Sequence, residues 1–535
     1  MNQKPAVSLN RDYMPTLPAA LVIGDGQSGL LSAKALTDIG IAVTMVKTRP
    51  DGRTLHCSAP DFDRQGFEKS LRSVLQEVEL VEPQGAVSMR RMGDDFEVRF
   101  GARNVRTFGC VFFTSGADMT TVPSDLPEGV AAVSPDRVPA PGTKVAFLLD
   151  YISPSSPAAG LTAIRQAIDN AASGGASFVI MKHAPVAHLF GEALYEDAKR
   201  AGVEFYRFGE TLPTVRPRPT DPSKDSGMCI SVVDVVEHGD PVTLEVDRLF
   251  YAGAPDASSV MPLAKEVLVN DVDEEGFLLS SSVHCHSGRS FANGVFAVGE
   301  CTGELDLIRT AAQAAAAAAR ARSWMVRACA RKEAEAVRFT DACIRCMTCL
   351  RLCPHNAISF VAGAGRSTVT ASAAACEECG VCVSECPRLV LDLVFFPEAA
   401  IESFVDEASR IHGSRPVAVY GCQRSPGRAA SRIGLPPDVL FLTVPCAGRI
   451  SESVLWATMA AGVQGILVVG CHHGNCASNN GTDWAEARVT AALEKLGVPT
   501  GMQPPVQYAS VAANEEARFS RIVRDFCRAV RGETT

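Results

Sequence analysis

Short apolar runs alternate with amphipathic stretches near the start of the chain, which is the pattern of strands and helices packed in layers. It predicts a strand over Ala20–Ile23, a helix over residues 30–39 and a second strand over residues 41–46. Residues 110–117 and 294–303 read as two further buried strands that end in small residues. Together these segments predict a parallel, doubly wound α/β sheet.

The same strand–helix–strand pattern returns further along the chain. Apolar strands are expected over residues 144–151 and 178–181, with a helix over residues 160–172 between them. A long alanine-rich helix is expected within residues 308–337. We therefore expect residues 1–337 to form a domain with two doubly wound subdomains.

A glycine motif, GDGQSG, follows the first strand at residues 24–29 and opens the first helix. Gly24, Gly26 and Gly29 are expected to permit the tight turn and the close approach of a pyrophosphate to the helix N-terminus. One feature departs from the usual pattern. Lys47 stands at the end of the second strand, where an acid commonly holds a ribose hydroxyl.

The later strands favour a flavin over a nicotinamide. Gly116 lies in the small-residue turn after the first of them, and the second closes on Gly299 and Glu300. Flavoproteins with two dinucleotide-binding domains place a Gly-Asp pair there, whose acid contacts the ribitol side of the flavin. The second subdomain lacks a G-x-G-x-x-G motif, because residues 150–157 read DYISPSSP. We expect FAD, and no reaction with NAD(P)H at the usual site.

Eight cysteines form two identical runs of C-x-x-C-x-x-C-x-x-x-C-P within residues 338–395. The runs are Cys343, Cys346, Cys349 and Cys353, then Cys376, Cys379, Cys382 and Cys386. This spacing is typical of a ferredoxin with two 4Fe–4S clusters, in which the fourth cysteine of each run ligates the other cluster. A structural zinc site uses pairs of C-x-x-C instead.

Residues 396–535 alternate strands and helices, and three predicted strands, at 417–420, 440–444 and 466–469, each precede a cysteine. The candidate ligands at these strand ends and in the following GCHHGNC loop are Cys422, Cys446, Cys471 and Cys476. Parallel strands bring such residues to one sheet edge. Four thiolates suit a 2Fe–2S cluster or tetrahedral zinc, and the neighbouring ferredoxin runs favour iron.

Composition narrows the class of protein. The chain has 535 residues, enough for three or four domains, and a formal net charge of −9, which offers no counter-charge for nucleic acid. No signal peptide and no apolar stretch of bilayer-crossing length are visible. Thiolate-held clusters without an export signal predict a reducing cytoplasm, with any membrane contact made through a partner protein.

These three segments in this order resemble the A subunit of heterodisulfide reductase fused to a delta subunit of methyl-viologen-reducing hydrogenase. The B subunit of the quinone-interacting membrane-bound oxidoreductase is similar. The resemblance is carried by ALVIGDGQSGLLSAKAL, GVFAVGECTGELDLIRTAAQAAAAAARA, the paired cysteine runs and VPCAGRISESVLWATMAAGVQGILVVGCHHGNC. It implies FAD, two 4Fe–4S clusters, one 2Fe–2S cluster and membership of a larger complex with other redox subunits.

Three functions are compatible with these features. The first is an electron-transferring flavo-iron–sulfur oxidoreductase subunit, in which electrons pass between the 2Fe–2S cluster and FAD through both 4Fe–4S clusters. The second is an NAD(P)H-dependent flavin reductase with a ferredoxin module, against which the absent second glycine motif argues. The third is a non-catalytic iron–sulfur adaptor that has lost flavin, for which Lys47 is the only support.

Overall fold

The computed structural model describes most of the chain. The residues outside the description are 1–16, 48–63, 84, 102–103, 115–121, 135–136, 156, 185, 187–190, 219–226, 236–240, 254–260, 269–271, 274–275, 282–287, 300, 304–306, 332–333, 362–367, 411–415, 498–504 and 534–535.

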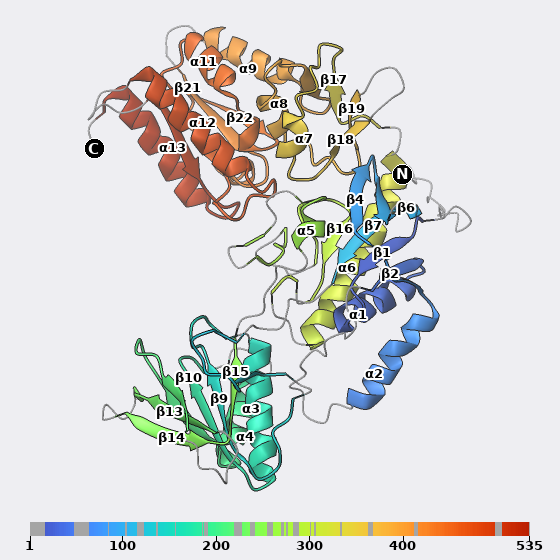
Figure 1. Ribbon diagram of the computed structural model, residues 1–535. Helices are drawn as coiled ribbons and strands as arrows, with labels where there is room; N and C mark the ends of the chain where they lie inside the picture. The colour runs from blue at the N-terminus through green and yellow to red at the C-terminus, as the bar shows by residue number, and fades with distance from the viewer. Residues whose placement is uncertain are drawn as a thin grey trace, which may run out of the picture.

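The first sheet is parallel, with the strand order β16-β7-β1-β2-β3 (Figure 1). Its strands are β1 (Ala20–Ile23), β2 (Val43–Val46), β3 (Glu79–Val81), β7 (Cys110–Phe113) and β16 (Val295–Ala297). The glycine motif leaves β1, so it lies at the carboxyl edge of the central strand. This arrangement confirms the predicted doubly wound sheet.

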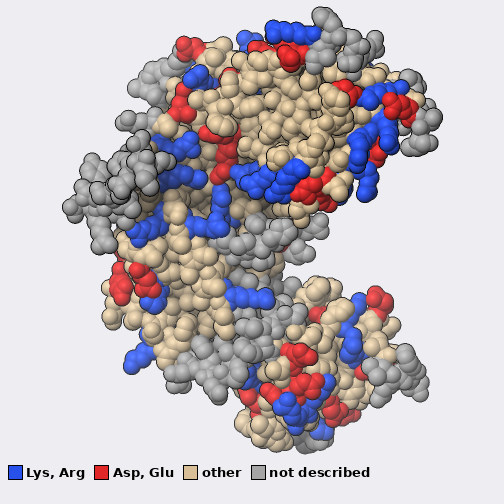
Figure 2. Space-filling model, turned by 180° about the vertical axis from the view of Figure 1, so that it is seen from behind, with Lys and Arg blue, Asp and Glu red and all other residues tan. Residues whose placement is uncertain are grey.

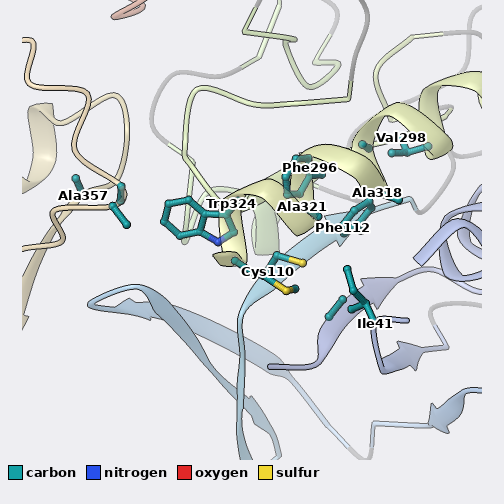
Figure 3. Packing of buried hydrophobic residues seen from close by; sticks show 14 of the residues in the cluster. Ile41, Cys110, Phe112, Phe296, Val298, Ala318, Ala321, Trp324 and Ala357 are labelled. Atoms are coloured by element: carbon teal, nitrogen blue, oxygen red, sulfur yellow. The ribbon is translucent and has the colours of Figure 1, made fainter. Parts of the chain in front are cut away.

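Helices cover one face of this sheet and a small antiparallel sheet covers the other. The helical side has α1 (Gln27–Thr37), α2 (Arg64–Arg72), the short η1 (Ser73–Gln76) and α6 (Leu307–Arg331); the antiparallel sheet has β4 (Val87–Met92), β5 (Asp95–Phe100) and β6 (Asn104–Phe108), and the short helix α5 (Met261–Ala264) packs beside it. On the helical side, Phe112 and Phe296 stack with ring centroids 4.8 Å apart against Ala318 and Ala321 of α6 (Figure 3). The small alanine side chains let the long helix approach the sheet closely.

The second doubly wound subdomain forms a separate lobe at the bottom of Figure 1. Its parallel sheet has the order β11-β10-β9-β15-β8, and an antiparallel sheet has the order β12-β13-β14. The elements are β8 (Ala131–Ala132), β9 (Lys144–Leu149), α3 (Pro157–Ala172), β10 (Ala176–Met181), α4 (Gly191–Arg200), β11 (Glu204–Arg207), β12 (Thr214–Pro217), β13 (Met228–Val232), β14 (Val242–Val246) and β15 (Arg248–Ala252). Separate apolar clusters fill the two faces of the parallel sheet.

The cysteine runs fold into a compact module with internal two-fold character. Strand β17 (Val337–Phe339) pairs with β20 (Leu391–Leu393), and β18 (Ile358–Val361) pairs with the antiparallel β19 (Thr368–Ala371) between the two runs. One short helix lies within each run, namely α7 (Thr348–Leu352) and α8 (Val381–Ser384).

The last segment is a parallel four-stranded sheet of order β22-β21-β23-β24 between helices. Its elements are α9 (Glu398–Arg410), β21 (Val417–Cys422), α10 (Pro426–Ala430), β22 (Val439–Val444), η3 (Ala447–Arg449), α11 (Glu452–Ala460), β23 (Gly465–Gly470), α12 (Gly481–Leu496), β24 (Val506–Ser510) and α13 (Glu516–Arg531). No described helix is long and apolar enough to cross a membrane. The domain boundaries at residues 337 and 395 stay predictions.

Candidate cofactor and cluster sites

The glycine motif and Gly299 meet at the carboxyl edge of the first sheet. Gly24 has a φ of 117°, and Gly26 caps α1 through its backbone alone. A Cβ on Gly29 would lie 2.0 Å from the carbonyl oxygen of Gly24, and one on Gly299 (φ 82°) would lie 2.2 Å from Ser28 Oγ. Glycine is therefore favoured at both positions, by the backbone of Gly24 in one case and by the Ser28 side chain and the positive φ in the other, and segments 270 residues apart form one cradle.

Helix α6 closes this cradle from one side. The buried side chain of Gln313 accepts the N–H of Gly299 at 2.7 Å. The hydroxyl of Thr310 is fully buried and has no hydrogen-bond partner among the described residues. An unpaired buried hydroxyl costs about 1–3 kcal/mol, so a polar ligand at this edge would relieve that cost. The cradle fits a dinucleotide cofactor. The predicted residues Gly116 and Glu300 lie outside the described residues.

Lys47 is held by a carboxylate that sequence reasoning did not identify. Its Nζ lies 2.7 Å from Oε1 of Glu82, at the end of β3. The hydrogen bond to Glu82 raises the pKa of Lys47 above its ordinary value. The parallel pairing of β2 with β3 brings the two residues together, so only the sheet order could have revealed the pair. Glu82 thus places an acid beside the strand end from which the usual acid is missing.

The eight ferredoxin cysteines separate into two crossed groups, as the spacing predicts. Cys386 lies with Cys343, Cys346 and Cys349, and the four line one cavity; we call this group site I. Cys353 lies with Cys376, Cys379 and Cys382, which we call site II. Each fourth cysteine therefore stands beside the three of the other run.

The backbone of the two runs repeats itself residue for residue. Positive φ angles occur before the second cysteine, after the second cysteine and three residues beyond the fourth. The residues concerned are Arg345, Met347 and Asn356 in the first run and Glu378, Gly380 and Leu389 in the second. Left-handed residues turn successive amides toward one point, as in other anion-binding loops. Glycine adopts this conformation without steric cost, and asparagine tolerates it better than most residues.

Backbone amides also donate to the cysteine sulfurs. The N–H of Ala357 donates to Cys353 at 3.4 Å, and the N–H of Val390 donates to Cys386 at the equivalent 3.5 Å. Hydrogen bonds to sulfur stabilise thiolates and tune cluster potentials. Burial raises the pKa of the Cys376 thiol to about 12, so ionised sulfur at this depth calls for a bound cation or cluster.

The four C-terminal cysteines form a ring at the edge of the last sheet; we call this group site III. Cys422 contacts Cys446 and Cys471, and Cys476 contacts the same two. The sulfurs of Cys422 and Cys471 lie 3.8 Å apart. Hydrogen bonds that the Cys446 thiol donates to Cys422 and Cys476, together with burial, raise the pKa of Cys446 well above its ordinary value. Four thiolates this close require a compensating positive charge.

The surroundings of site III fit a thiolate-held group. Gly481 begins α12 directly against the ring, since a Cβ there would lie 2.4 Å from the Cys446 sulfur. The positive end of a helix dipole stabilises thiolates. His472 contacts Glu515 at 2.7 Å, and His473 contacts Asp483 at 2.7 Å. Both rings are thus held by carboxylates, which leaves the four thiols as the donor set.

Site II lies directly against site III. The Cys379 sulfur is hydrogen-bonded to the side chain of Ser478. The nearby Cys476 of site III also contributes to raising the pKa of the Cys379 thiol. The same loop packs on the buried Arg449, because a Cβ on Gly380 would lie 2.3 Å from Arg449 Cδ. The tight fit of this loop fixes the spacing between the two thiol groups.

The choice between iron and zinc at site III depends on the neighbouring site II. Four thiolates suit both groups: a 2Fe–2S cluster divides them between two irons, whereas zinc gathers all four around one centre. A redox-inactive zinc ion gains nothing from standing beside a ferredoxin cluster, but a two-iron cluster there can exchange electrons with it. The contact between sites II and III therefore favours iron.

Glu377, between two cysteines of site II, joins three parts of the chain. Its Oε1 accepts from Arg289 at 2.8 Å and from Asn293 at 3.0 Å, both in the first segment of the chain. Its Oε2 accepts from Arg424 of the C-terminal segment at 3.1 Å. Figure 2 shows Lys and Arg side chains gathered where the upper lobe meets the middle of the molecule. The sequence did not predict this role of Glu377, because only the fold brings Arg289, Asn293 and Arg424 to its carboxylate.

Removal of the Glu377 charge is expected to weaken this junction. Burial alone would raise the pKa of its carboxyl, but Asn293 and the charges of Arg289, His355 and Arg424 lower the pKa to about 2. We expect Glu377→Gln to lower the free energy of unfolding by about 1–3 kcal/mol, since two arginines lose their counter-charge. Thermal unfolding of the anaerobic protein measures this, with Glu407→Gln on the exposed side of α9 as the control. Equal midpoints for the two variants would contradict the role of Glu377.

Comparison with known families finds matches in two parts of the chain. The family described as "4Fe-4S dicluster domain" matches residues 342–390. The family described as "Methyl-viologen-reducing hydrogenase, delta subunit" matches residues 417–532. These matches confirm the predicted ferredoxin module and the predicted delta-subunit-like segment.

Two hydrogenase subunits are similar to a part of this chain. The iron-sulfur D subunit of the F420-non-reducing hydrogenase of Archaeoglobus profundus is 29% identical over 101 residues, which are 19% of this chain and 73% of that protein. The iron-sulfur D subunit of the vhc F420-non-reducing hydrogenase of Methanococcus voltae is 28% identical over 97 residues, 18% of this chain and 65% of its own. A thioredoxin reductase structure from Lactococcus lactis aligns with a TM-score of 0.42 and 15% identity, covering 58% of this chain and 99% of that one.

The resemblance of the first segment to the A subunit of heterodisulfide reductase stays a prediction. The matches to the second and third segments do not depend on it. The chain therefore carries a 4Fe–4S dicluster domain followed by a domain of the methyl-viologen-reducing hydrogenase delta-subunit family.

Proposed function

We propose that this protein is an electron-transferring flavo-iron–sulfur oxidoreductase subunit. It would hold FAD in the cradle of Gly24, Gly26, Gly29 and Gly299, 4Fe–4S clusters at sites I and II, and a 2Fe–2S cluster at site III. Its partners would be other redox subunits of a complex similar to heterodisulfide reductase. Gly116 and Glu300 are proposed to contact the flavin.

The observation that carries this proposal is the adjacency of three thiol groups. Site I lies near site II, since the negative charge of a Cys349 thiolate in site I would help to raise the pKa of Cys382 in site II. Site II adjoins site III through Cys379 and Ser478. Electron transfer slows steeply with distance, so neighbouring cluster sites suit a relay.

The protein residues would supply binding and electrostatics in this relay. Twelve thiolates would hold the metal, backbone amides stabilise their charge, and Glu377 fixes site II against both neighbouring domains. FAD, when bound, exchanges electrons singly or in pairs and so can join a two-electron partner to one-electron clusters.

The structure of the second subdomain argues against a reductase that binds NAD(P)H at the usual site. After β9, Asp150 adopts a φ of 58° and its carboxylate accepts the N–H groups of Ser155 at 2.7 Å and His183 at 2.9 Å. A fixed carboxylate at the carboxyl edge of this sheet would repel a pyrophosphate. Glycines would normally leave that space open.

Metal content tests the proposal directly. Protein purified without oxygen is expected to contain about ten irons, from two four-iron clusters and one two-iron cluster. Elemental analysis, with acid-labile sulfide measured on the same sample, gives this number. About eight irons with one zinc per chain would overturn the assignment of site III while leaving the ferredoxin sites in place.

A further inference from the structure

Arg91, in β4, is a buried cation that uses only part of its hydrogen-bonding capacity. The residue is 5% exposed. Its Nη2 donates to the backbone carbonyl of Asn293, whereas Nε and Nη1 have no hydrogen-bond partner among the described residues. The guanidinium carbon lies 4.3 Å from the ring centroid of Phe96 and 5.4 Å from that of Trp324. Aromatic faces offset part of the cost of burying a cation, but the two unpaired donors leave a cost that a nearby anion would relieve.

Hydrogen bonds place Arg91 beside the chain segments that carry the site II thiols. Ser359 in β18, which follows the last cysteine of the first run, donates to the Arg91 carbonyl at 3.4 Å. The side chain of Asn293 donates to the carbonyl of Ala375 at 2.9 Å, and Ala375 directly precedes Cys376. Arg91 therefore belongs to the first segment of the chain but lies against the ferredoxin module, next to site II.

The negative groups that act on Arg91 include a thiol of site II. Burial lowers the pKa of the Arg91 guanidinium to about 10, although Asp94, the Cys353 thiol and Asp95 act to raise it. The charge of Arg91 in turn opposes the effect of burial on the pKa of Cys353. The groups around Arg91 thus do not fully compensate for its burial. A 4Fe–4S cluster held by four thiolates at site II would add net negative charge at this depth, where charges are weakly screened.

We propose that Arg91 is the buried counter-charge of site II and raises the reduction potential of the cluster held there. This inference rests on the proposed function. Reduction adds one electron, and so one unit of negative charge, to the cluster; a fixed cation nearby therefore stabilises the reduced form more than the oxidised form. No bond forms or breaks, and no proton is transferred. Because β4 lies in the first segment, site II gains this charge only when the ferredoxin module packs against that segment.

A redox titration of the full-length protein tests this role. Anaerobic protein is titrated with dithionite, and electron paramagnetic resonance follows the site II signal, which is identified as the signal absent from Cys353→Ala. Arg91→Met keeps an apolar chain between Phe96 and Trp324 but removes the charge. At a fixed potential we expect it to lower the ratio of reduced to oxidised site II cluster about tenfold, which is a fall of about 59 mV for a one-electron couple.

Two further variants separate the charge of Arg91 from its packing. Arg91→Lys keeps a cation at the same position and is expected to change this ratio by less than about threefold. Arg90→Met removes the neighbouring arginine, which is 55% exposed and lies 2.9 Å from Oε1 of Glu97. It makes the same change of net charge, but at the surface, where solvent screens it, so we expect the ratio to change by less than about twofold.

The proposal is overturned by an unchanged ratio in Arg91→Met, by equal falls in Arg91→Met and Arg91→Lys, or by an equal fall in Arg90→Met. If Arg91→Met loses site II iron, the measurement is repeated on Arg91→Gln, which keeps a donor toward Asn293. Iron loss from both neutral variants, with full iron in Arg91→Lys, would support the need for a cation, whereas iron loss from all three would overturn it.

Iron content and the reduced spectrum of the wild-type protein separate this inference from the proposed function. Wild-type protein without a cluster at site II would defeat the proposed function itself. Wild-type protein that holds the cluster, with the same potential as Arg91→Met, would defeat only the counter-charge role of Arg91.

Discussion

Cys386→Ala is expected to release the iron held by Cys343, Cys346 and Cys349, although Cys386 lies only four residues after Cys382 in the sequence. The structure places the Cys386 side chain in the cavity of site I, beside the three cysteines of the first run. Removal of one of the four thiolates leaves one iron of the cluster without a protein ligand. That iron is then open to exchange with solvent and to oxidation. We expect iron to fall from about ten to about six per chain, as one four-iron cluster is lost.

The cluster at site II is also expected to be affected in the Cys386→Ala variant, but site I is expected to lose its iron first. Helix α8 carries Cys382 of site II and leads directly into Cys386, so relaxation of the chain at Cys386 reaches a site II ligand. The matched variant is Cys353→Ala, which should empty site II first. Electron paramagnetic resonance of the reduced proteins distinguishes the two clusters. Loss of the cluster held by Cys376, Cys379 and Cys382 in the Cys386 variant, with the site I cluster intact, would contradict the crossed arrangement.

Local patterns in the sequence predicted the parts of the fold that depend on local physics. The strands predicted at Ala20–Ile23 and at residues 466–469 are confirmed, because apolar runs act over a few residues. The cysteine spacing also predicted the crossed grouping, because the same spacing is typical of two-cluster ferredoxins. The first helix begins at Gln27, three residues earlier than predicted, since Gly26 caps it through the backbone.

Features that depend on the packing of distant segments could not be predicted in this way. Glu377 meets Arg289 and Arg424 only after three segments have packed together. Glu82 reaches Lys47 through the order of β2 and β3, and Ser478 reaches Cys379 through the fit of the last two segments. The sequence does carry one hint: the spacer between Cys376 and Cys379 is Glu-Glu, whereas the equivalent spacer in the first run is Ile-Arg. That difference marks the run whose loop is buried among arginines.

Gly29→Ala is expected to abolish FAD binding, and it addresses the part of the proposed function on which catalysis depends. The added methyl group would lie 2.0 Å from the Gly24 carbonyl oxygen and 3.0 Å from Thr114 Oγ1. The first of these is backbone and cannot rotate away, so the turn between β1 and α1 must shift. Such overpacking costs about 1–3 kcal/mol and moves the amides that would receive the pyrophosphate. Gly434→Ala is the control, because a methyl group there meets nothing within 4 Å.

The measurement is the ratio of FAD to polypeptide after gel filtration, with iron content determined on the same fractions. Wild type and Gly434→Ala should retain flavin, whereas Gly29→Ala should lose it and keep its iron, because sites I, II and III lie in later segments of the chain. Loss of iron together with flavin would indicate general misfolding, and Gly24→Ala, at a φ of 117°, then provides a second test of the same turn. Wild-type protein with full iron that neither contains nor takes up FAD would overturn the flavin assignment. The chain would then be an iron–sulfur adaptor, with sites II and III joining its partner enzymes.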